Sequence, residues 1–397
     1  MENFELTVSE LARLEPDSYV LADIRGETAF SYGHIPGAAP MPEWELFAEH
    51  PEWKGKKLVV YCQKGEQSLG AVQRLQERGI EAQSLKGGYL GWLISSAGER
   101  QMNEDYYKDV EQSLRKKFRK DIWCNFTKAV REYELVNEGD RIAVCISGGK
   151  DSMLMAKLFQ ELKRHNKVSF DLVFLVMNPG YSEGNMEIIR QNAKNLHIPI
   201  TVFESDIFES VFQVEKSPCY LCARMRRGYL YSKAKELGCN KIALGHHYDD
   251  VIETILMGML YGGQVQTMMP KLHSTNFEGM ELIRPLYLVR EDRIKAWRDY
   301  NGLGFIQCAC KFTDTCSTCN PDGANASKRM DVKQLIREMK KTNPFVESNI
   351  FRSVENVNLS TVVAYKKDGV KHHFLETYDR AAETEFAETQ KAGADEQ

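Results

Sequence analysis

The sequence predicts an α/β protein with two units, each built around a parallel β-sheet. Three observations predict this fold. Short apolar runs rich in Val, Ile and Leu alternate with helical patterns, and this alternation occurs in two series separated by a helical stretch at 101–135. The chain has 397 residues, enough for two or three hydrophobic cores. Strands that alternate with helices favour parallel pairing, because parallel neighbours need a long crossover connection.

Composition excludes a membrane-spanning protein. Apolar residues make up 43% and charged residues 27%, as in ordinary globular proteins, and no run of about 18 apolar residues is present. The acidic start of the chain lacks the basic and apolar stretches of a secretory signal, so we expect a cytoplasmic protein with no membrane partner. Its ten cysteines are then reduced, and their clustering indicates metal binding or sulfur chemistry.

The first unit is expected at residues 1–98. Segments 19–24, 57–61 and 82–85 are predicted strands, and 70–79 is a predicted crossover helix that ends at a glycine. Residues 87–92, with three glycines, are predicted to form a turn.

Cys62 directly follows the second of these strands and opens a loop over 62–68, after which a helix begins. We expect backbone amides and a helix N-terminus to point at its sulfur, which stabilises a thiolate or a persulfide. The alternative is a cysteine that only packs at the end of a strand.

Four motifs carry a resemblance over this segment. They are Asp23-Ile24-Arg25, the stretch 34–38, the Cys62 loop and the stretch 87–92, and they occur in the order and spacing of rhodanese domains. The resemblance implies that Cys62 accepts a persulfide sulfur from a cysteine desulfurase or another persulfide donor and passes it on. Gln63 and Ser68 stand where the commoner rhodanese loop has arginines. A unit that serves only for docking or regulation remains the alternative.

The second unit is expected at 136–358, after a helical linker at 99–135. Strands are predicted at 141–146, 171–176 and 241–244, with helices beginning near Asp151, Asn185 and Cys219, which favours a doubly wound parallel sheet. A C-terminal hairpin with an Asp-Gly turn is predicted at 359–376, and a disordered acidic tail at 377–397.

A glycine-containing loop lies between the strand at 141–146 and the following helix. Its glycines let the backbone wrap a phosphate, while its hydroxyls, its lysine and the helix N-terminus attract the charge. The nucleotide-binding candidates in it are Ser147, Gly148, Gly149, Lys150, Asp151 and Ser152. The spacing differs from that of Walker A, so γ-phosphate transfer is not favoured.

This loop resembles the PP-loop of ATP pyrophosphatases, whose fold is of the adenine nucleotide alpha hydrolase type. The resemblance implies ATP and Mg²⁺ as ligands, with Lys150 and Asp151 as catalytic candidates. It also places the loop that begins at Gly245 beside the nucleotide, where Asp249 or Asp250 organises Mg²⁺ or the loop. A separate metal site at 246–250 is disfavoured, because adjacent residues on a helix point in different directions.

Cysteines cluster in two places in the second unit. Cys219 and Cys222 form a C-x-x-C pair at a predicted helix end, which is typical of a metal site, an iron-sulfur site or a redox pair. Four more thiols follow at Cys308, Cys310, Cys316 and Cys319. Thiolates favour iron-sulfur or zinc over magnesium. The remaining Cys124, Cys145 and Cys239 are expected to be buried and apolar in role.

Residues 115–358 resemble the TtcA family of tRNA 2-thiocytidine synthases. The motifs that carry this resemblance are 219–228, 245–250, 261–263, 270–272 and 305–308. It implies tRNA as a partner and a [4Fe-4S] cluster held by Cys219, Cys222 and Cys308, with Cys310 as the alternative third ligand. Cys316 and Cys319 either hold a Zn²⁺ ion or bind no metal.

Basic side chains are the candidates for the tRNA surface, because phosphate neutralisation dominates RNA binding. They are Arg224, Arg226 and Arg227, together with the run at 115–120. Their alternative role is that of solvated surface residues. Residues 101–375 carry about six more basic than acidic side chains, which permits a polyanionic partner.

These resemblances together imply an ATP-dependent tRNA sulfurtransferase that adenylates a pyrimidine carbonyl, C2 of cytidine, and replaces its oxygen with sulfur. The prediction requires Lys150 and Cys222 to face one cavity. A cluster-free thiolation of the 4-thiouridine type is the alternative, and a homodimer is possible.

Overall fold

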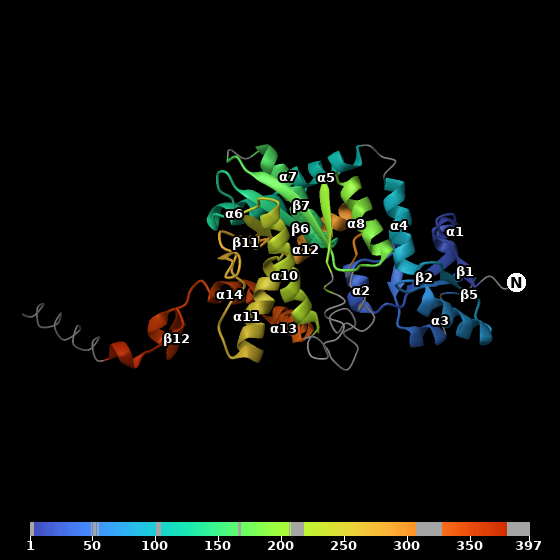
Figure 1. Cartoon of the computed structure of the whole chain (residues 1–397). Helices are drawn as coiled ribbons and strands as arrows, with labels where there is room; N and C mark the ends of the chain where they lie inside the picture. Colours follow the sequence, from blue (N-terminus) through green and yellow to red (C-terminus); the bar gives the residue numbers. More distant parts are fainter. Residues whose placement is uncertain are drawn as a thin grey trace, which may run out of the picture.

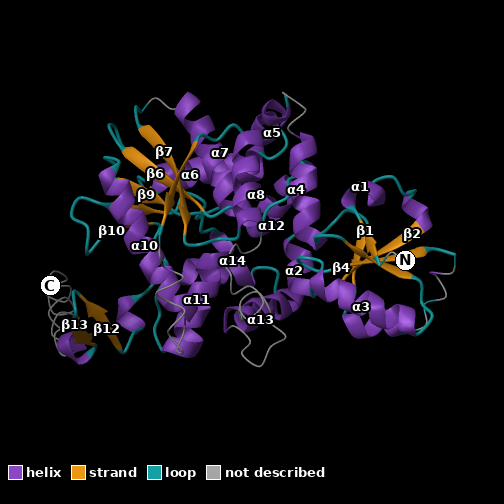
Figure 2. Ribbon diagram, turned by 45° about the vertical axis from the view of Figure 1, so that its right-hand side comes forward, coloured by secondary structure: helices purple, strands orange, loops and turns teal. Residues whose placement is uncertain are grey.

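The computed structural model describes residues 4–48, 50, 53, 55–100, 105–165, 168–205, 207, 218–306 and 328–378. The backbone alone is described at 99–100 and 218–223. Two sheets form the two units, with helices around each (Figures 1 and 2). Within the described ranges, no helix is both long and apolar enough to cross a bilayer.

The first unit is a five-stranded, fully parallel sheet in the order β1-β5-β4-β2-β3. Its strands are β1 (Glu5–Leu6), β2 (Tyr19–Asp23), β3 (Ala38–Pro40), β4 (Lys57–Tyr61) and β5 (Ala82–Leu85). Its helices are α1 (Val8–Leu11), α2 (Glu27–Tyr32), α3 (Glu66–Glu77) and α4 (Gly88–Arg100), with short 3₁₀ turns at Pro16–Ser18 and Glu43–Phe47. The three predicted strands are confirmed. The stretch 87–92 is a turn only at its start, because Gly88 already begins α4.

The second unit is a six-stranded sheet in the order β10-β11-β9-β6-β7-β8, parallel except for β10. Its strands are β6 (Arg141–Ile146), β7 (Asp171–Asn178), β8 (Ile200–Glu204), β9 (Lys241–Ala243), β10 (Lys271–His273) and β11 (Glu281–Ile283). Its helices are α7 (Lys150–His165), α8 (Glu183–Asn195), α10 (Pro218–Glu236), α11 (Tyr248–Gly262) and α12 (Glu291–Tyr300). The doubly wound sheet is confirmed. The strand order reverses between β6 and β9, and ligands of such sheets bind at the carboxyl ends of the strands at this point.

Within residues 105–132, the helical stretch between the units is broken once. Its elements are α5 (Tyr106–Arg115), a π-helix (Arg119–Trp123) and α6 (Cys124–Glu132). Cys124 is exposed, so the prediction that it is buried is wrong: it begins α6 on the side away from Phe126 and Ala129, which fill the core. Cys145 and Cys239 are buried, as predicted.

The C-terminal part begins with α13 (Lys328–Thr342) and α14 (Val346–Ser353), which pack on α11 through an apolar cluster. After a 3₁₀ turn (Leu359–Thr361), the predicted hairpin is present as β12 (Ala364–Lys367) and β13 (Val370–His373). Asp368 and Gly369 have φ values of 50° and 80°, as the two central residues of a type I′ turn require. Most of the tail that is predicted to be disordered, 379–397, lies outside the described residues.

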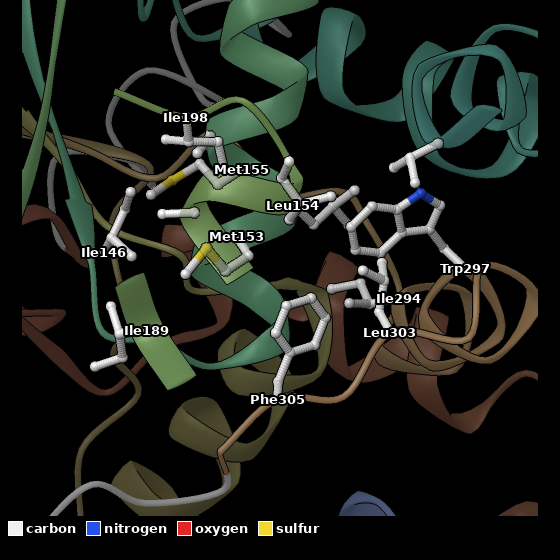
Figure 3. Close-up of a cluster of buried hydrophobic side chains, with 14 of the residues drawn as sticks. Ile146, Met153, Leu154, Met155, Ile189, Ile198, Ile294, Trp297, Leu303 and Phe305 are labelled. Atoms are coloured by element: carbon white, nitrogen blue, oxygen red, sulfur yellow. The ribbon is translucent and has the colours of Figure 1, made fainter. Parts of the chain in front are cut away.

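One continuous apolar core joins the two units. It contains Leu85 and Leu93 from the first unit together with Met153 and Ile189 from the second. Figure 3 shows its centre, where Met153 and Leu154 of α7 lie among side chains of β6, α8 and α12 and of the segment after α12. Because these core contacts anchor the first turns of α7, the N-terminus of the helix is held in place at the end of β6.

Candidate nucleotide and sulfur sites

The phosphate loop is a tight connection between β6 and α7. The amide of Ser147 donates to Oγ of Ser152 (3.2 Å), and that hydroxyl in turn donates to the carbonyl of Gly149 (3.0 Å). These bonds fold the loop over the first turn of α7, whose amides have no carbonyl partner within the helix. The arrangement has the geometry of sites that bind an anion such as a phosphate.

Two glycines permit this close packing. Gly148 has a φ of +86°, and a Cβ there would stand 2.5 Å from Cγ1 of Ile189 and 2.9 Å from Cδ1 of Ile306. A Cβ on Gly245 would stand 3.2 Å from the amide nitrogen of Ser152. The loop that begins at Gly245 therefore lies directly against the phosphate loop, as the resemblance implied.

Lys150 is enclosed, with 1% of its side chain exposed. Its Nζ lies 3.1 Å from Oδ2 of Asp151, 3.4 Å from Oε1 of Glu291 and 4.5 Å from the ring centre of Tyr32. Burial alone lowers the pKa of Lys150, but the charges of Asp151 and Glu291 outweigh burial and raise it. Lys150 is therefore a charged group that other side chains surround.

Among the described residues, Asp151 uses one of its carboxylate oxygens in hydrogen bonding. Oδ2 accepts from Lys150, whereas Oδ1 is buried without a hydrogen-bond partner there and lies 3.9 Å from Nε2 of His247. A buried carboxylate oxygen beside a phosphate site has the chemistry of a Mg²⁺ ligand.

Asp249 and Asp250 are engaged within the protein. Asp249 accepts from the side chain of Arg290 (3.0 Å) and from the amide of Glu291 (2.7 Å). Asp250 accepts from the amide of His247 (3.0 Å), which closes the first turn of α11, and from Arg329 (2.8 Å). Burial opposes ionisation of Asp250, but His247 and other nearby cationic groups lower its pKa to about 2. Both carboxylates thus hold together the loop around Gly245.

Cys62 lies in a pocket of the first unit in which hydrogen-bond donors surround its sulfur. It is 2% exposed, and its Sγ accepts from the amides of Gly65 (3.1 Å) and Ser68 (3.4 Å) and from the hydroxyl of Ser68 (3.5 Å). Helix α3 begins at Glu66, so its N-terminus points at the same sulfur. The geometry expected from the sequence is present, and it suits an anionic sulfur.

Two other predicted motifs support this loop. Arg25 makes a bidentate ion pair with Asp23, stacks on the ring of Tyr89 at 3.8 Å and donates to Oε1 of Gln63 (3.3 Å). Gly88 lies so close that a Cβ there would overlap the carbonyl of Cys62. The motifs that are far apart in the sequence therefore surround one loop.

The cysteine cluster is described only in part. Cys219 and Cys222 occupy the first turns of α10, but their side chains lie outside the described residues, as do Cys308, Cys310, Cys316 and Cys319. Among the described residues, no three His, Cys, Asp or Glu side chains are grouped to hold a metal ion. The cavity expected to join Lys150 and Cys222 also lies outside what is described.

The start of α10 can still be placed through its neighbours. Met225 and Tyr229 pack with Met177, at the carboxyl end of β7, and with Ile207. Ile146, the last residue of β6, pairs with Val176. The first part of α10 therefore lies at the same edge of the sheet as the phosphate loop.

The predicted basic residues are accessible. Arg224 and Arg227 are exposed, and Arg226 is half-buried over the ring of Tyr181 at 5.7 Å. The run at 115–120 is exposed at each of its five basic positions.

Comparison with known proteins supports both units. A PP-loop domain family matches residues 118–311, and a Rhodanese-like domain family matches residues 7–95. A tRNA-cytidine(32) 2-sulfurtransferase of Alkalilimnicola ehrlichii is 36% identical over 238 residues, 58% of this chain and 71% of the relative. One from Pelobacter propionicus is 34% identical over 234 residues, 58% of this chain and 83% of the relative.

The chain belongs to the tRNA-cytidine(32) 2-sulfurtransferase family. A solved structure, the U34-tRNA thiolase NcsA from Methanococcus maripaludis with its [4Fe-4S] cluster, covers 59% of this chain and 78% of its own, at 21% identity and a TM-score of 0.46.

The candidates predicted from the sequence do not include three residues that lie close to Lys150 or Asp249. Tyr32 comes from the first unit, and Glu291 and Arg290 stand at the start of α12. No motif marks them, because they reach the loop only through the packing of the two units and of α12. Glu291 lies among Lys150, Lys295 and Lys333. Burial opposes ionisation of Glu291, but these lysines lower its pKa.

Proposed function

We propose that the protein is an ATP-dependent tRNA sulfurtransferase that replaces the C2 oxygen of a cytidine with sulfur. Family membership supports this substrate, and the observation that carries the proposal is that the phosphate loop and the Cys62 pocket share one continuous core. The carbonyl oxygen of a pyrimidine is a poor leaving group. Transfer of AMP from ATP to this oxygen releases pyrophosphate, and sulfide then attacks C2 and expels AMP.

The phosphate loop would bind the nucleotide. In this proposal, the amides of the first turn of α7 and the hydroxyl of Ser147 contact the phosphates. Oδ1 of Asp151, which lacks a hydrogen-bond partner, would bind Mg²⁺. The ion supplies positive charge that neutralises the phosphate oxygens. Asp249 and Asp250 keep the neighbouring loop in place rather than contacting the ion.

Cys62 would deliver the sulfur as a persulfide, received from a cysteine desulfurase or another persulfide donor. The three donors around its sulfur would stabilise the negative charge. Release of the outer sulfur as sulfide requires two electrons, which two molecules of a thiol reductant supply as they form a disulfide. The Cys62 thiol is regenerated in the same step.

Thiolates are the donors that iron-sulfur clusters take. We propose Cys219, Cys222 and Cys308 as the ligands of a [4Fe-4S] cluster, because the first part of α10 lies at the edge of the sheet that carries the phosphate loop. Such a cluster supplies an iron atom to which sulfur can bind. A Zn²⁺ ion at Cys316 and Cys319 stays a separate prediction.

The surface proposed for tRNA combines the arginines of α10 with the exposed basic run at 115–120. Binding through phosphates weakens steeply with salt. We also propose functional boundaries after residues 98, 135 and 358, and a place in the cytoplasm, where tRNA is available.

The test is thiolation of unmodified tRNA in the presence of MgATP, a persulfide donor and a thiol reductant, with the protein purified without oxygen. Mass spectrometry of the nucleosides is expected to show 2-thiocytidine. Cys62→Ala should abolish the reaction from the persulfide donor, whereas Cys124→Ala, at an exposed cysteine, should leave it unchanged. Formation of 4-thiouridine would instead favour the alternative base, and unchanged rates in Cys62→Ala would leave the first unit a docking role.

A further inference from the structure

The end of α2 reaches from the first unit to the phosphate loop of the second. α2 lies on the side of the first sheet that faces the second unit (Figures 1 and 2). The ring of its last residue, Tyr32, lies 4.5 Å from Nζ of Lys150. Asp151 and Glu291 lie close to the same ammonium group. An aromatic face attracts a cation, and the attraction is stronger where water is excluded.

The backbone at this point is held from both units. The carbonyl of Tyr32 accepts from the guanidinium of Arg298, on α12. The next carbonyl, that of Gly33, accepts from Nη2 of Arg25 (2.7 Å), and Nη1 of Arg25 donates to Gln63 in the Cys62 loop (3.3 Å). A continuous series of contacts therefore joins the loop that carries the sulfur to the loop that would bind ATP.

A second contact fixes the orientation of the first unit. α4 packs on α8 at Gly184, where a Cβ would stand 3.4 Å from Leu90 and 3.8 Å from Ile94. Nδ2 of Asn195 donates to the carbonyl of Ala97 (2.9 Å). With α4 on α8 and α2 on the phosphate loop, the first unit is held at two separate points.

We propose that Tyr32 is a positioning residue for sulfur delivery, whose ring docks the carrier unit on the phosphate loop through Lys150. This inference rests on the proposed function. In it, the ammonium of Lys150, which two carboxylates and the ring enclose, is the contact point between the first unit and the phosphate loop. Loss of the ring loosens α2 and displaces Cys62 from the activated base.

Two sulfur sources separate this role from a role in ATP chemistry. A persulfide donor requires delivery through Cys62, whereas excess inorganic sulfide attacks the adenylated base without it. In Tyr32→Ala, the ratio of the persulfide-driven to the sulfide-driven rate is expected to fall by about tenfold or more, since a displaced reacting group costs that much. Tyr32→Phe keeps the ring and should restore the ratio to within about twofold of the original protein.

The matched control is Tyr300→Ala. Tyr300 also has a lysine over its ring, Lys117 at 3.9 Å, but it is exposed on the outer side of α12. Its removal should leave the ratio unchanged. Equal loss of both rates in Tyr32→Ala, or no loss of either, would overturn the inference. A protein that thiolates tRNA from neither source would instead refute the proposed function.

Hydrogen exchange gives a readout that does not depend on activity. Amides of residues 26–34 should exchange faster in Tyr32→Ala than in the original protein and should be restored in Tyr32→Phe. Equal exchange in all three proteins would show that the ring does not dock α2, whatever the reaction proves to be.

Discussion

Nζ of Lys157 lies 2.7 Å from Oε1 of Glu111, and both side chains are buried between α7 and α5. Burial opposes ionisation of Glu111, but hydrogen bonds from Arg164 and Lys157 lower its pKa. Glu111→Gln should therefore lower the free energy of unfolding by about 3 kcal/mol, because it leaves a buried ammonium without its anion. Urea unfolding measures this. Glu338→Gln, in the exposed pair with Lys341, should cost less than about 1 kcal/mol, and equal losses would contradict the prediction.

Gly148→Ala should abolish nucleotide binding. The new methyl group meets Ile189 and Ile306, so the loop must shift, and the positive φ adds strain. Gly139→Ala is the matched control, because Gly139 also has a positive φ, +78°, but no atom lies within 4 Å of its added Cβ. It should cost only about 1 kcal/mol of stability and leave ATP affinity intact. Calorimetric titration with ATP compares the two, and normal affinity in Gly148→Ala would contradict the assignment of the loop.

Asp151→Asn should weaken MgATP binding by about tenfold, the effect of losing roughly 1.4 kcal/mol of binding energy. Its expected cause is the loss of the carboxylate oxygen that has no hydrogen-bond partner. Affinity for ATP measured with a metal chelator should change much less. Asp171→Asn, at the exposed start of β7, is the control. If Asp151→Asn weakened both forms of ATP equally, the proposed magnesium contact would be wrong.

Glu253 makes the free energy of unfolding depend on pH. Burial raises its pKa to about 7, although Lys333 and Arg329 oppose the shift. The folded protein therefore retains a proton that the unfolded chain releases near pH 4.5. Glu253 contributes stability below this pH that is lost as the pH rises through 7.

Glu253→Gln should thus remove up to about 3 kcal/mol of the fall in unfolding free energy between pH 4.5 and pH 8. Urea unfolding of both proteins across this range measures the difference. A variant with the same pH dependence as the original protein would show that Glu253 ionises normally.

The sequence predicted the central strands of both sheets because most residues of those strands are apolar. Lys57–Tyr61 and Arg141–Ile146 are buried over most of their length, and each contains a run of apolar residues after its first position. The edge strands β1 and β10 were missed, as was β11 beside β10. β1 has two residues, and β10 and β11 have three each, with His273 opposite Glu281. Such short and partly polar segments acquire their pairing from the sheet beside them.

The candidate site was predictable where one loop contains all its parts. The Cys62 and Ser147 loops each contain their hydrogen-bonding groups within a few residues. Tyr32 and Glu291 could not be found in this way, because neither lies near Lys150 in the sequence. Asp249 is a candidate from its place in the sequence, but its hydrogen bond from Arg290 depends on how α12 packs.

The shared core limits how the first unit can be exchanged for another domain. Leu85, Leu93 and Ile189 belong to one apolar cluster, so the two units are not interchangeable modules. If the first hundred residues were exchanged for those of a free-standing rhodanese domain, the apolar face of α8 would lose the side chains of α4 that pack on it. Replacement of the first unit would therefore require coordinated substitutions on both sides of the junction.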